Sequence, residues 1–173
     1  MKRQTKSIDD AIVAIKESSK DSSVYIGCDS IRFKRGEEWW ICYSTVVVVH
    51  KASKHGGQIF SENEYERQYQ GPSREKPTNG LHQRLMSEVG YALAVFDRIS
   101  PVLADRYFEI HLDINSDDMY ASNQVVKQAL GWVRSYSIGN ELVGDRAKIK
   151  PDAWAATHAA DHVVRKPKYI PVE

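Results

Sequence analysis

The longest strand-like stretch of the sequence is Trp39-Trp40-Ile41-Cys42-Tyr43-Ser44-Thr45-Val46-Val47-Val48-Val49. It consists almost entirely of β-branched and aromatic residues, a composition typical of a buried β-strand. Strand-like residues 24–28 precede it and residues 58–60 follow it, with Gly36 and Gly56-Gly57 in the two connections. Because glycine in such connections favours turns, the sequence predicts a three-stranded antiparallel meander.

Helices and strands alternate in the rest of the chain. Apolar periodicity predicts helices over residues 7–18, 81–99, 124–136 and 152–165, and strands over residues 107–114 and 142–149. Ser100-Pro101 is expected to end the second helix, Pro151 to open the last one, and residues 63–80 to form a long loop. Since strands joined by a helical crossover pair in parallel, we expect an α/β fold. Its five-stranded mixed sheet has the order 3-2-1-4-5, with helices on both faces.

The composition narrows the class of protein. The 173 residues suggest one domain, and 24 Lys and Arg against 23 Asp and Glu give a formal net charge of +1. Proteins that coat nucleic acid are usually strongly basic, so this balance weighs against a scaffold-type binder. It allows a metal-dependent nuclease, which needs carboxylates at its centre and basic groups only around them.

Cysteine content and hydropathy indicate the compartment. Two cysteines are too few for a disulfide scaffold or an all-cysteine metal site. No apolar run approaches the ~20 residues needed to cross a bilayer. The basic N-terminus is not followed by the apolar stretch of a signal peptide. We therefore expect a cytoplasmic protein without a membrane segment.

Two aspartates follow strands directly. Asp29 comes after residues 24–28, although Asp is a poor strand former, and Asp113 lies at the end of the strand over residues 107–114 in the same way. Ligands of open α/β sheets bind beyond the carboxyl ends of parallel strands, so the two side chains should emerge side by side if their strands are neighbours. A turn or cap residue is the alternative interpretation of Asp29.

Two further acids lie on helices. Glu88 falls inside the apolar stripe of its helix, where a charged residue is rare unless it is paired or binds a metal; an ion pair with Arg84 is the alternative. Asp161 borders the small-residue face of the last helix. His158 and His162 on that helix stand four residues apart, which would suit zinc, but no third nitrogen or sulfur ligand is evident and a solvated histidine face is favoured.

The four acids, on four elements, could meet at one point. Clusters of carboxylate oxygens bind Mg²⁺ or Mn²⁺. A pair of such ions ~3.5–4 Å apart activates water and stabilises the leaving oxygen in phosphodiester cleavage. Without metal the carboxylates would repel one another. We therefore expect Asp29, Glu88, Asp113 and Asp161 to be metal ligands, with His158 or His162 assisting proton transfer or product release.

Three blocks of sequence carry a family resemblance: Tyr25-Ile26-Gly27-Cys28-Asp29-Ser30, His111-Leu112-Asp113-Ile114-Asn115 and Ile149-Lys150-Pro151-Asp152-Ala153-Trp154-Ala155-Ala156. Together with an acid on the helix after the meander and Ala160-Asp161 on the last helix, they resemble the ribonuclease H-like superfamily. Within it, they are most similar to the YkuK-type family of predicted ribonuclease H-related nucleases.

The resemblance spans roughly residues 23–165 and implies a single ribonuclease H-like domain over residues 1–173. The helix over residues 7–18 precedes the core of this domain. It also implies a divalent-metal acid site, in which Asp29, Asp113 and Asp161 match the motif acids. Glu64, Glu66 and Glu75 are alternatives to Glu88 for the fourth acid.

Two functions from different classes remain in view. The first is a Mg²⁺- or Mn²⁺-dependent nuclease acting on RNA, an RNA–DNA hybrid or structured DNA. The second is a catalytically silent module of the same fold that binds nucleic acid or a protein partner. Basic side chains that could contact nucleic acid around the site, or be ordinary surface charge, are Arg32, Lys34, Arg35, Lys51, Lys54, His55, Arg74, Lys76, Arg165, Lys166 and Lys168.

Overall fold

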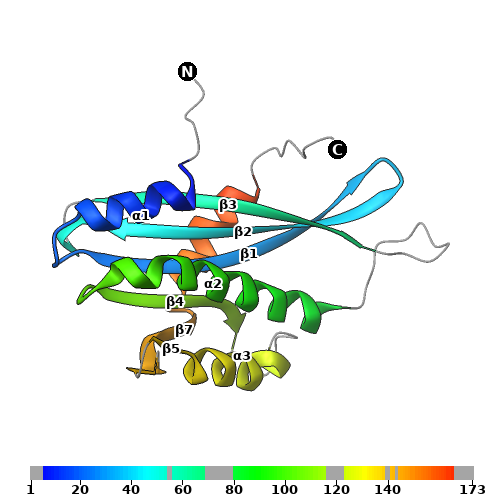
Figure 1. Ribbon diagram of the computed structural model, residues 1–173. Helices are drawn as coiled ribbons and strands as arrows, with labels where there is room; N and C mark the ends of the chain where they lie inside the picture. Colours follow the sequence, from blue (N-terminus) through cyan, green and yellow to red (C-terminus); the bar gives the residue numbers. More distant parts are fainter. Residues whose placement is uncertain are drawn as a thin grey trace.

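A mixed sheet of five strands in the order β3-β2-β1-β4-β7 forms the centre of the computed structural model (Figure 1). The structure describes residues 6–53, 56–68, 80–115, 123–138, 141–142 and 144–165. Antiparallel pairs join β1 to β2 and β2 to β3, and parallel pairs join β1 to β4 and β4 to β7. The order predicted from the sequence is therefore confirmed, with β7 as the fifth strand. The strands of this sheet are β1 (Ser23–Arg35), β2 (Glu38–His50), β3 (Gly57–Gln68), β4 (Tyr107–Asn115) and β7 (Ala147–Lys150).

Helices cover both faces of the sheet, as predicted. In Figure 1, α1 (Ile8–Glu17) and α2 (Leu81–Leu103) lie in front of the strands, and α3 (Asn123–Ser135), which packs against α2, lies below β4. The π-helical segment η3 (Ala155–Ala160) and its continuation α4 (Asp161–Val164) lie behind them, in orange and red. The remaining short elements are η1 (Lys51–Ser53), η2 (Gly144–Arg146) and a separate pair of strands, β5 (Ser137–Ile138) and β6 (Glu141–Leu142).

The apolar run Val46–Val49 of β2 follows from burial on both faces. Val47 and Val49 belong to the main core with α1, α2 and α3, whereas Val46 and Val48 pack against η3 and α4 on the other face. Successive side chains of a strand point to opposite faces, so a strand covered on both sides favours apolar residues at consecutive positions. This strand therefore separates a large core from a smaller one.

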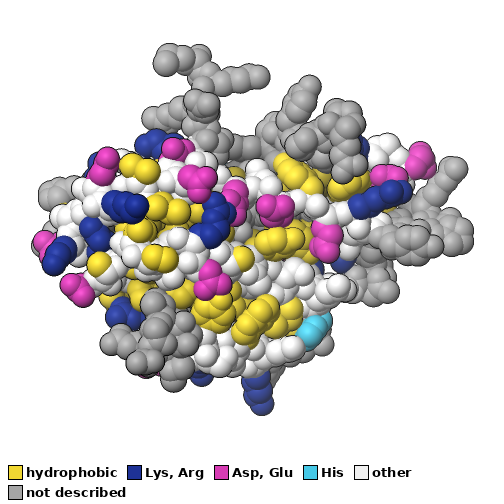
Figure 2. Space-filling model, in the orientation of Figure 1, with side chains coloured by type: hydrophobic (Ala, Val, Ile, Leu, Met, Phe, Trp, Pro, Cys, Tyr) yellow, Lys and Arg dark blue, Asp and Glu magenta, His cyan; other side chains and the backbone are white. Residues whose placement is uncertain are grey.

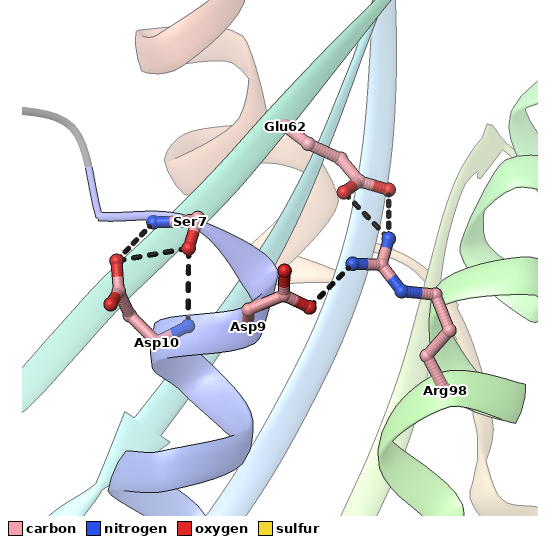
Figure 3. A network of polar contacts seen from close by, with 5 residues as sticks. All are labelled: Ser7, Asp9, Asp10, Glu62 and Arg98. Carbon is pink, nitrogen blue, oxygen red and sulfur yellow. Dashed lines mark hydrogen bonds and ion pairs between the residues drawn. The ribbon is translucent and has the colours of Figure 1, made fainter.

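Polar contacts at the N-terminus of α1 fix this helix against the edge of the sheet (Figure 3). Ser7 and Asp10 form a capping box, in which each side chain accepts a hydrogen bond from the other residue's backbone N–H. The guanidinium of Arg98 on α2 reaches Glu62 on β3 and Asp9 on α1, with N···O distances of 2.7 and 3.1 Å. One arginine thus links two helices and the edge strand.

The front face shown in Figure 2 mixes Lys and Arg with Asp and Glu among hydrophobic side chains, without a basic patch of one sign. This distribution agrees with the near-neutral composition. No helix in the part of the chain that the structure describes is long and apolar enough to cross a membrane.

Several predicted boundaries are wrong. β1 continues seven residues beyond Cys28 to Arg35, and β3 runs to Gln68 through the first part of the predicted loop over residues 63–80, whose residues 69–79 lie outside the described ranges. The reason is the partner strand, because β2 pairs with β1 from Arg35–Glu38 onward and with β3 from Trp39–Gln68 onward. Pairing thus extends polar segments that have little strand propensity of their own.

Two helix boundaries also differ. α2 continues through Ser100-Pro101 to Leu103, because the Ser100 hydroxyl donates to the Asp97 carbonyl, which the proline cannot bond. The last helix begins at Trp154, after a turn closed by the Asp152 N–H and the Ile149 carbonyl, and not at Pro151. The predicted strand over residues 142–149 is divided, because η2 separates β6 from β7.

Candidate functional site

The parallel pairing of β1 with β4 stops one residue before two of the predicted acids. The last pair is Cys28–Leu112, so Asp29 and Asp113 are the next residues on the two strands. The prediction that Asp29 ends its strand is wrong, because β1 stays paired with β2 beyond this residue. Cys28 and Leu112 point into the main core, and alternation therefore places both aspartates on the opposite face, under α4.

Asp161 comes to the same place from the first turn of α4. Together with Asp29 and Asp113 it lines one open cavity of about 290 Å³, whose other lining residues are Ser30, Ile31, Lys150, Thr157, Val164 and Arg165. Buried Ala160, Val163 and Val164 hold this helix on the sheet, as the small-residue pattern predicted. The structure thus brings three of the four predicted acids together.

Each of these aspartates already has a polar partner. Asp29 Oδ1 accepts the Ser30 N–H at 2.8 Å. Asp113 Oδ1 accepts the Thr157 hydroxyl at 3.1 Å and lies 2.9 Å from the Lys150 ammonium. The Arg165 guanidinium pairs with Asp161 one turn away on the same helix end. Two cations therefore stand inside the cavity beside the acids.

Glu88 approaches from the other side of the sheet. It is 5% exposed on α2, where the Ser30 hydroxyl donates to its Oε1 at 2.6 Å. It borders a small crevice that also includes Asp113, but not the cavity that Asp29 lines. Ser30 is thus its direct hydrogen-bond partner, while the charge of Arg84 acts on it from nearby.

The alternatives to Glu88 are less well placed. Glu64 and Glu66 lie on β3, which β2 separates from β1 and β4, and Glu75 is outside the described residues. Among the described candidates, Glu88 is the one whose charge interacts with both strand aspartates.

Burial and like charge raise the pKa values of Asp29 and Glu88. Burial, followed by the negative charges of Asp113 and Asp161, raises the pKa of Asp29 from 3.8 to about 7, although the Ser30 N–H and Lys150 oppose the change. Burial also raises the pKa of Glu88, with smaller contributions from Asp29 and Asp113. Strongly shifted acids in a cleft are typical of functional sites.

The donor set suits a hard divalent cation in type and charge. The three aspartates that line the cavity offer carboxylate oxygens, which are the ligands that Mg²⁺ and Mn²⁺ prefer. Burial, and after it the negative charges of Asp113 and Asp161, raise the pKa of Asp29, and a bound cation would favour its ionised form. As they stand, however, no three His, Cys, Asp or Glu side chains in the described residues are arranged to hold a metal ion together.

His158 does not line the cavity. It is exposed on η3, next to Thr157, which does line it. His162 is likewise exposed, in agreement with the solvated histidine face favoured above. A role of His158 in proton transfer stays a prediction.

Sequence reasoning missed His111, which the structure buries completely. The Ala155 N–H donates to His111 Nδ1 at 2.9 Å, so the ring proton is on Nε2, which donates to Glu109 at 2.9 Å. This neutral imidazole connects β4 to the start of the helix that carries Thr157 and Asp161. Its position two residues before Asp113, on the same face of the strand, was the available signal.

Lys150, Thr157 and Ser30 were also missed. Thr157 stands four residues before Asp161, which is helical spacing for a shared face. Lys150 ends β7 opposite Asn115 of β4, a register that the sequence alone does not give.

The basic residues proposed around the site are widely spread. Arg165 lines the cavity, Arg32, Lys34 and Arg35 lie along the far part of β1, and Lys51 is exposed in η1. In Figure 1 the β1–β2 hairpin extends beyond the helices. Outside the described residues lie Lys54, His55, Arg74, Lys76, Lys166 and Lys168.

Comparison with known proteins agrees with the fold. Residues 6–165 match the family model described as ribonuclease H-like, whereas no curated protein and no solved structure matches the chain at a significant level. Such a match indicates a nuclease or another nucleic-acid-related function, and nucleases of this type generally use divalent metals. The matched segment includes β1, β4 and the last helix, which carry the three clustered aspartates. The chain belongs to the ribonuclease H-like family.

Proposed function

We propose that the protein is a Mg²⁺- or Mn²⁺-dependent nuclease that hydrolyses phosphodiester bonds in RNA, an RNA–DNA hybrid or structured DNA. The main support is the convergence of Asp29, Asp113 and Asp161 on one open cavity, at the point where two parallel strands separate. A fold without a catalytic role for these acids gains nothing from holding them together, because clustered like charges destabilise it.

In this proposal Asp29, Asp113 and Asp161 hold the metal, and Glu88 contributes as fourth acid from the opposite face. When bound, a divalent cation supplies a more acidic water and stabilises negative charge on phosphate oxygens. The side chains of the protein orient the acids: Thr157 and Lys150 fix the Asp113 carboxylate.

Other cavity residues would receive the substrate. Arg165, paired with Asp161, presents positive charge to an incoming phosphate. Ile31 and Val164 form an apolar part of the wall beside it. His158 would assist proton transfer or product release only if it reaches the cavity from its exposed position, so a His158→Ala variant tests that role. The three sequence blocks further support a place in the YkuK-type family.

A catalytically silent module that binds nucleic acid or a protein partner is the second candidate. It is favoured by the two internal ion pairs, because Lys150 and Arg165 already neutralise part of the charge of Asp113 and Asp161. In that case the lysine and arginine would stabilise the acids permanently, and no metal would be needed.

Cleavage of end-labelled RNA, RNA–DNA hybrid and branched DNA separates the two candidates. We expect cleavage with Mg²⁺ or Mn²⁺, none with EDTA, and none by Asp29→Asn. Asp105→Asn is the matched control, since Asp105 is exposed and its contact with Lys20 is long, at 3.9 Å. Millimolar Mn²⁺ should also raise the melting temperature of the wild type, and that of Asp29→Asn much less. Absence of both cleavage and a metal-linked shift would favour the silent module.

A further inference from the structure

The cavity carries its own cations next to the acids. Lys150 Nζ lies 2.9 Å from Asp113 Oδ1, and the two side chains are 34% and 18% exposed. The Arg165–Asp161 pair is more open, with Arg165 71% exposed at the end of the helix. Exposed pairs are screened by water and contribute little, so the lysine is the better fixed and less screened cation of the two.

The charges limit how many divalent ions the cavity can take. The three carboxylates that line the cavity, Asp29, Asp113 and Asp161, carry three negative charges when they are ionised. Lys150 neutralises one of them, whereas the exposed Arg165 is screened by water and offsets little charge. The remaining two negative charges balance one divalent cation, whereas two such ions would leave an excess of positive charge in a partly buried site.

The carboxylate oxygens of Asp29 and Asp113 are consistent with a single bound cation. The recorded contacts of Asp113 with Lys150 and Thr157 both involve Oδ1, and that of Asp29 with Ser30 also involves Oδ1. Among the described residues no recorded hydrogen bond uses the Oδ2 atom of either aspartate. One oxygen of each strand aspartate is thus left to bind a metal ion, while the other is held by the protein.

We propose that the site binds a single divalent cation through Asp29 and Asp113, with Asp161 as the third acid across the cavity, and that the Lys150 ammonium takes the place of a second ion. The inference rests on the proposed metal-dependent function. Lys150 is well suited to this position because it ends β7, whose backbone is paired with Asn115 of β4, close to Asp113. The paired backbone of the sheet therefore fixes the position from which the Lys150 side chain reaches Asp113.

Counting bound Mn²⁺ tests the inference without measuring activity. Free Mn²⁺ would be followed by electron paramagnetic resonance during titration of the full chain. The variants are Lys150→Met, which removes the charge at similar length, and Lys150→Arg, which keeps it. Lys148→Met is the matched control: Lys148 lies on the same strand, is 37% exposed and does not line the cavity.

We expect one Mn²⁺ per chain for the wild type, Lys148→Met and Lys150→Arg. Lys150→Met should take up a second ion, or bind the first at least about tenfold more tightly, because a positive charge next to the ligand is removed. Two ions in the wild type, or identical binding by Lys150→Met and Lys148→Met, would overturn the single-cation proposal alone. No Mn²⁺ bound by any form would overturn the proposed function with it. Should Lys150→Met fail to fold, the stoichiometry of the wild type still decides.

Discussion

Replacement of Asp29 by Asn should stabilise the metal-free protein, and the gain should depend on pH. Asn keeps the shape of the side chain and can still accept the Ser30 N–H through Oδ1. It removes the charge that burial, Asp113 and Asp161 disfavour. The folded protein holds a proton on Asp29 up to about pH 7, whereas the unfolded chain loses it near pH 3.8. Stability of the wild type therefore falls as pH rises through this window, and reaches its lower plateau above it.

The magnitude follows from the two pKa values. The difference between 3.8 and about 7 corresponds to ~4 kcal/mol at ~1.4 kcal/mol per pKa unit. Because the side chain keeps some contact with water, we expect ~2–4 kcal/mol of this to be realised. For a domain of this size, a change of 1 kcal/mol moves the melting temperature by ~2–4 °C. Asp29→Asn should therefore melt about 5–15 °C above the wild type at pH 8.5 and within a few degrees of it at pH 4.

The assay is thermal unfolding followed by circular dichroism in EDTA, at half-unit steps from pH 4 to pH 9. Asp105→Asn removes the same charge from an exposed site and should show no such pH-dependent gain. A stabilisation equal at all pH values, or an Asp29→Asn protein that is less stable than the wild type throughout, would refute the reasoning. The latter result would indicate a structural Asp29.

Three further substitutions test contacts that support the fold and the site. Arg106→Ala should lower the free energy of unfolding, measured in urea, by ~2–3 kcal/mol, because this side chain donates to carbonyls at the end of α2 and to the segment after α1. An unchanged unfolding midpoint would show that these hydrogen bonds do not stabilise the fold. His111→Phe leaves the buried Ala155 N–H without its acceptor and should cost ~1–3 kcal/mol by the same measurement, and equal stability would contradict the connection between β4 and the last helix. Ser30→Ala should destabilise by ~1–2 kcal/mol, more at pH 9 than at pH 5, because ionised Glu88 then lacks its donor; a loss independent of pH would argue that Glu88 stays protonated throughout.

The sheet order could be predicted because the deciding signals are local. Residues 39–49 are apolar at nearly every position, and the structure explains this by burial of β2 on both faces. Helix-forming segments between the later strands then require parallel crossovers. The lengths of β1 and β3 could not be predicted, because Asp29-Ser30 and Glu62-Asn63-Glu64 look like strand ends until the register with β2 is known.

The acids were recognisable for a similar reason. Asp29 and Asp113 each follow a strand-forming run directly, although Asp is a poor strand former, and Glu88 stands within an apolar stripe. Each violates a local rule, and such violations concentrate at functional sites. Lys150 and Thr157 violate no rule in their own segments. Only the β4–β7 register and the position of the last helix place them beside Asp113.

The sequence also did not predict that Glu88 lies on the opposite face of the sheet from the three aspartates. Its position within the apolar stripe of α2 predicts burial, which the structure bears out at 5% exposure. Its separation from the cavity follows from the alternation of Asp29 and Ser30 on β1, which sends the two side chains to opposite faces.

The most direct test of the metal-binding site is a crystal of the wild-type protein soaked in Mn²⁺, with an anomalous difference map at the manganese edge. We expect a peak in contact with carboxylate oxygens of both Asp29 and Asp113, with Asp161 facing it across the cavity. A map without manganese there at millimolar concentration, with Lys150 still on Asp113, would contradict the account and leave the silent module as the better description.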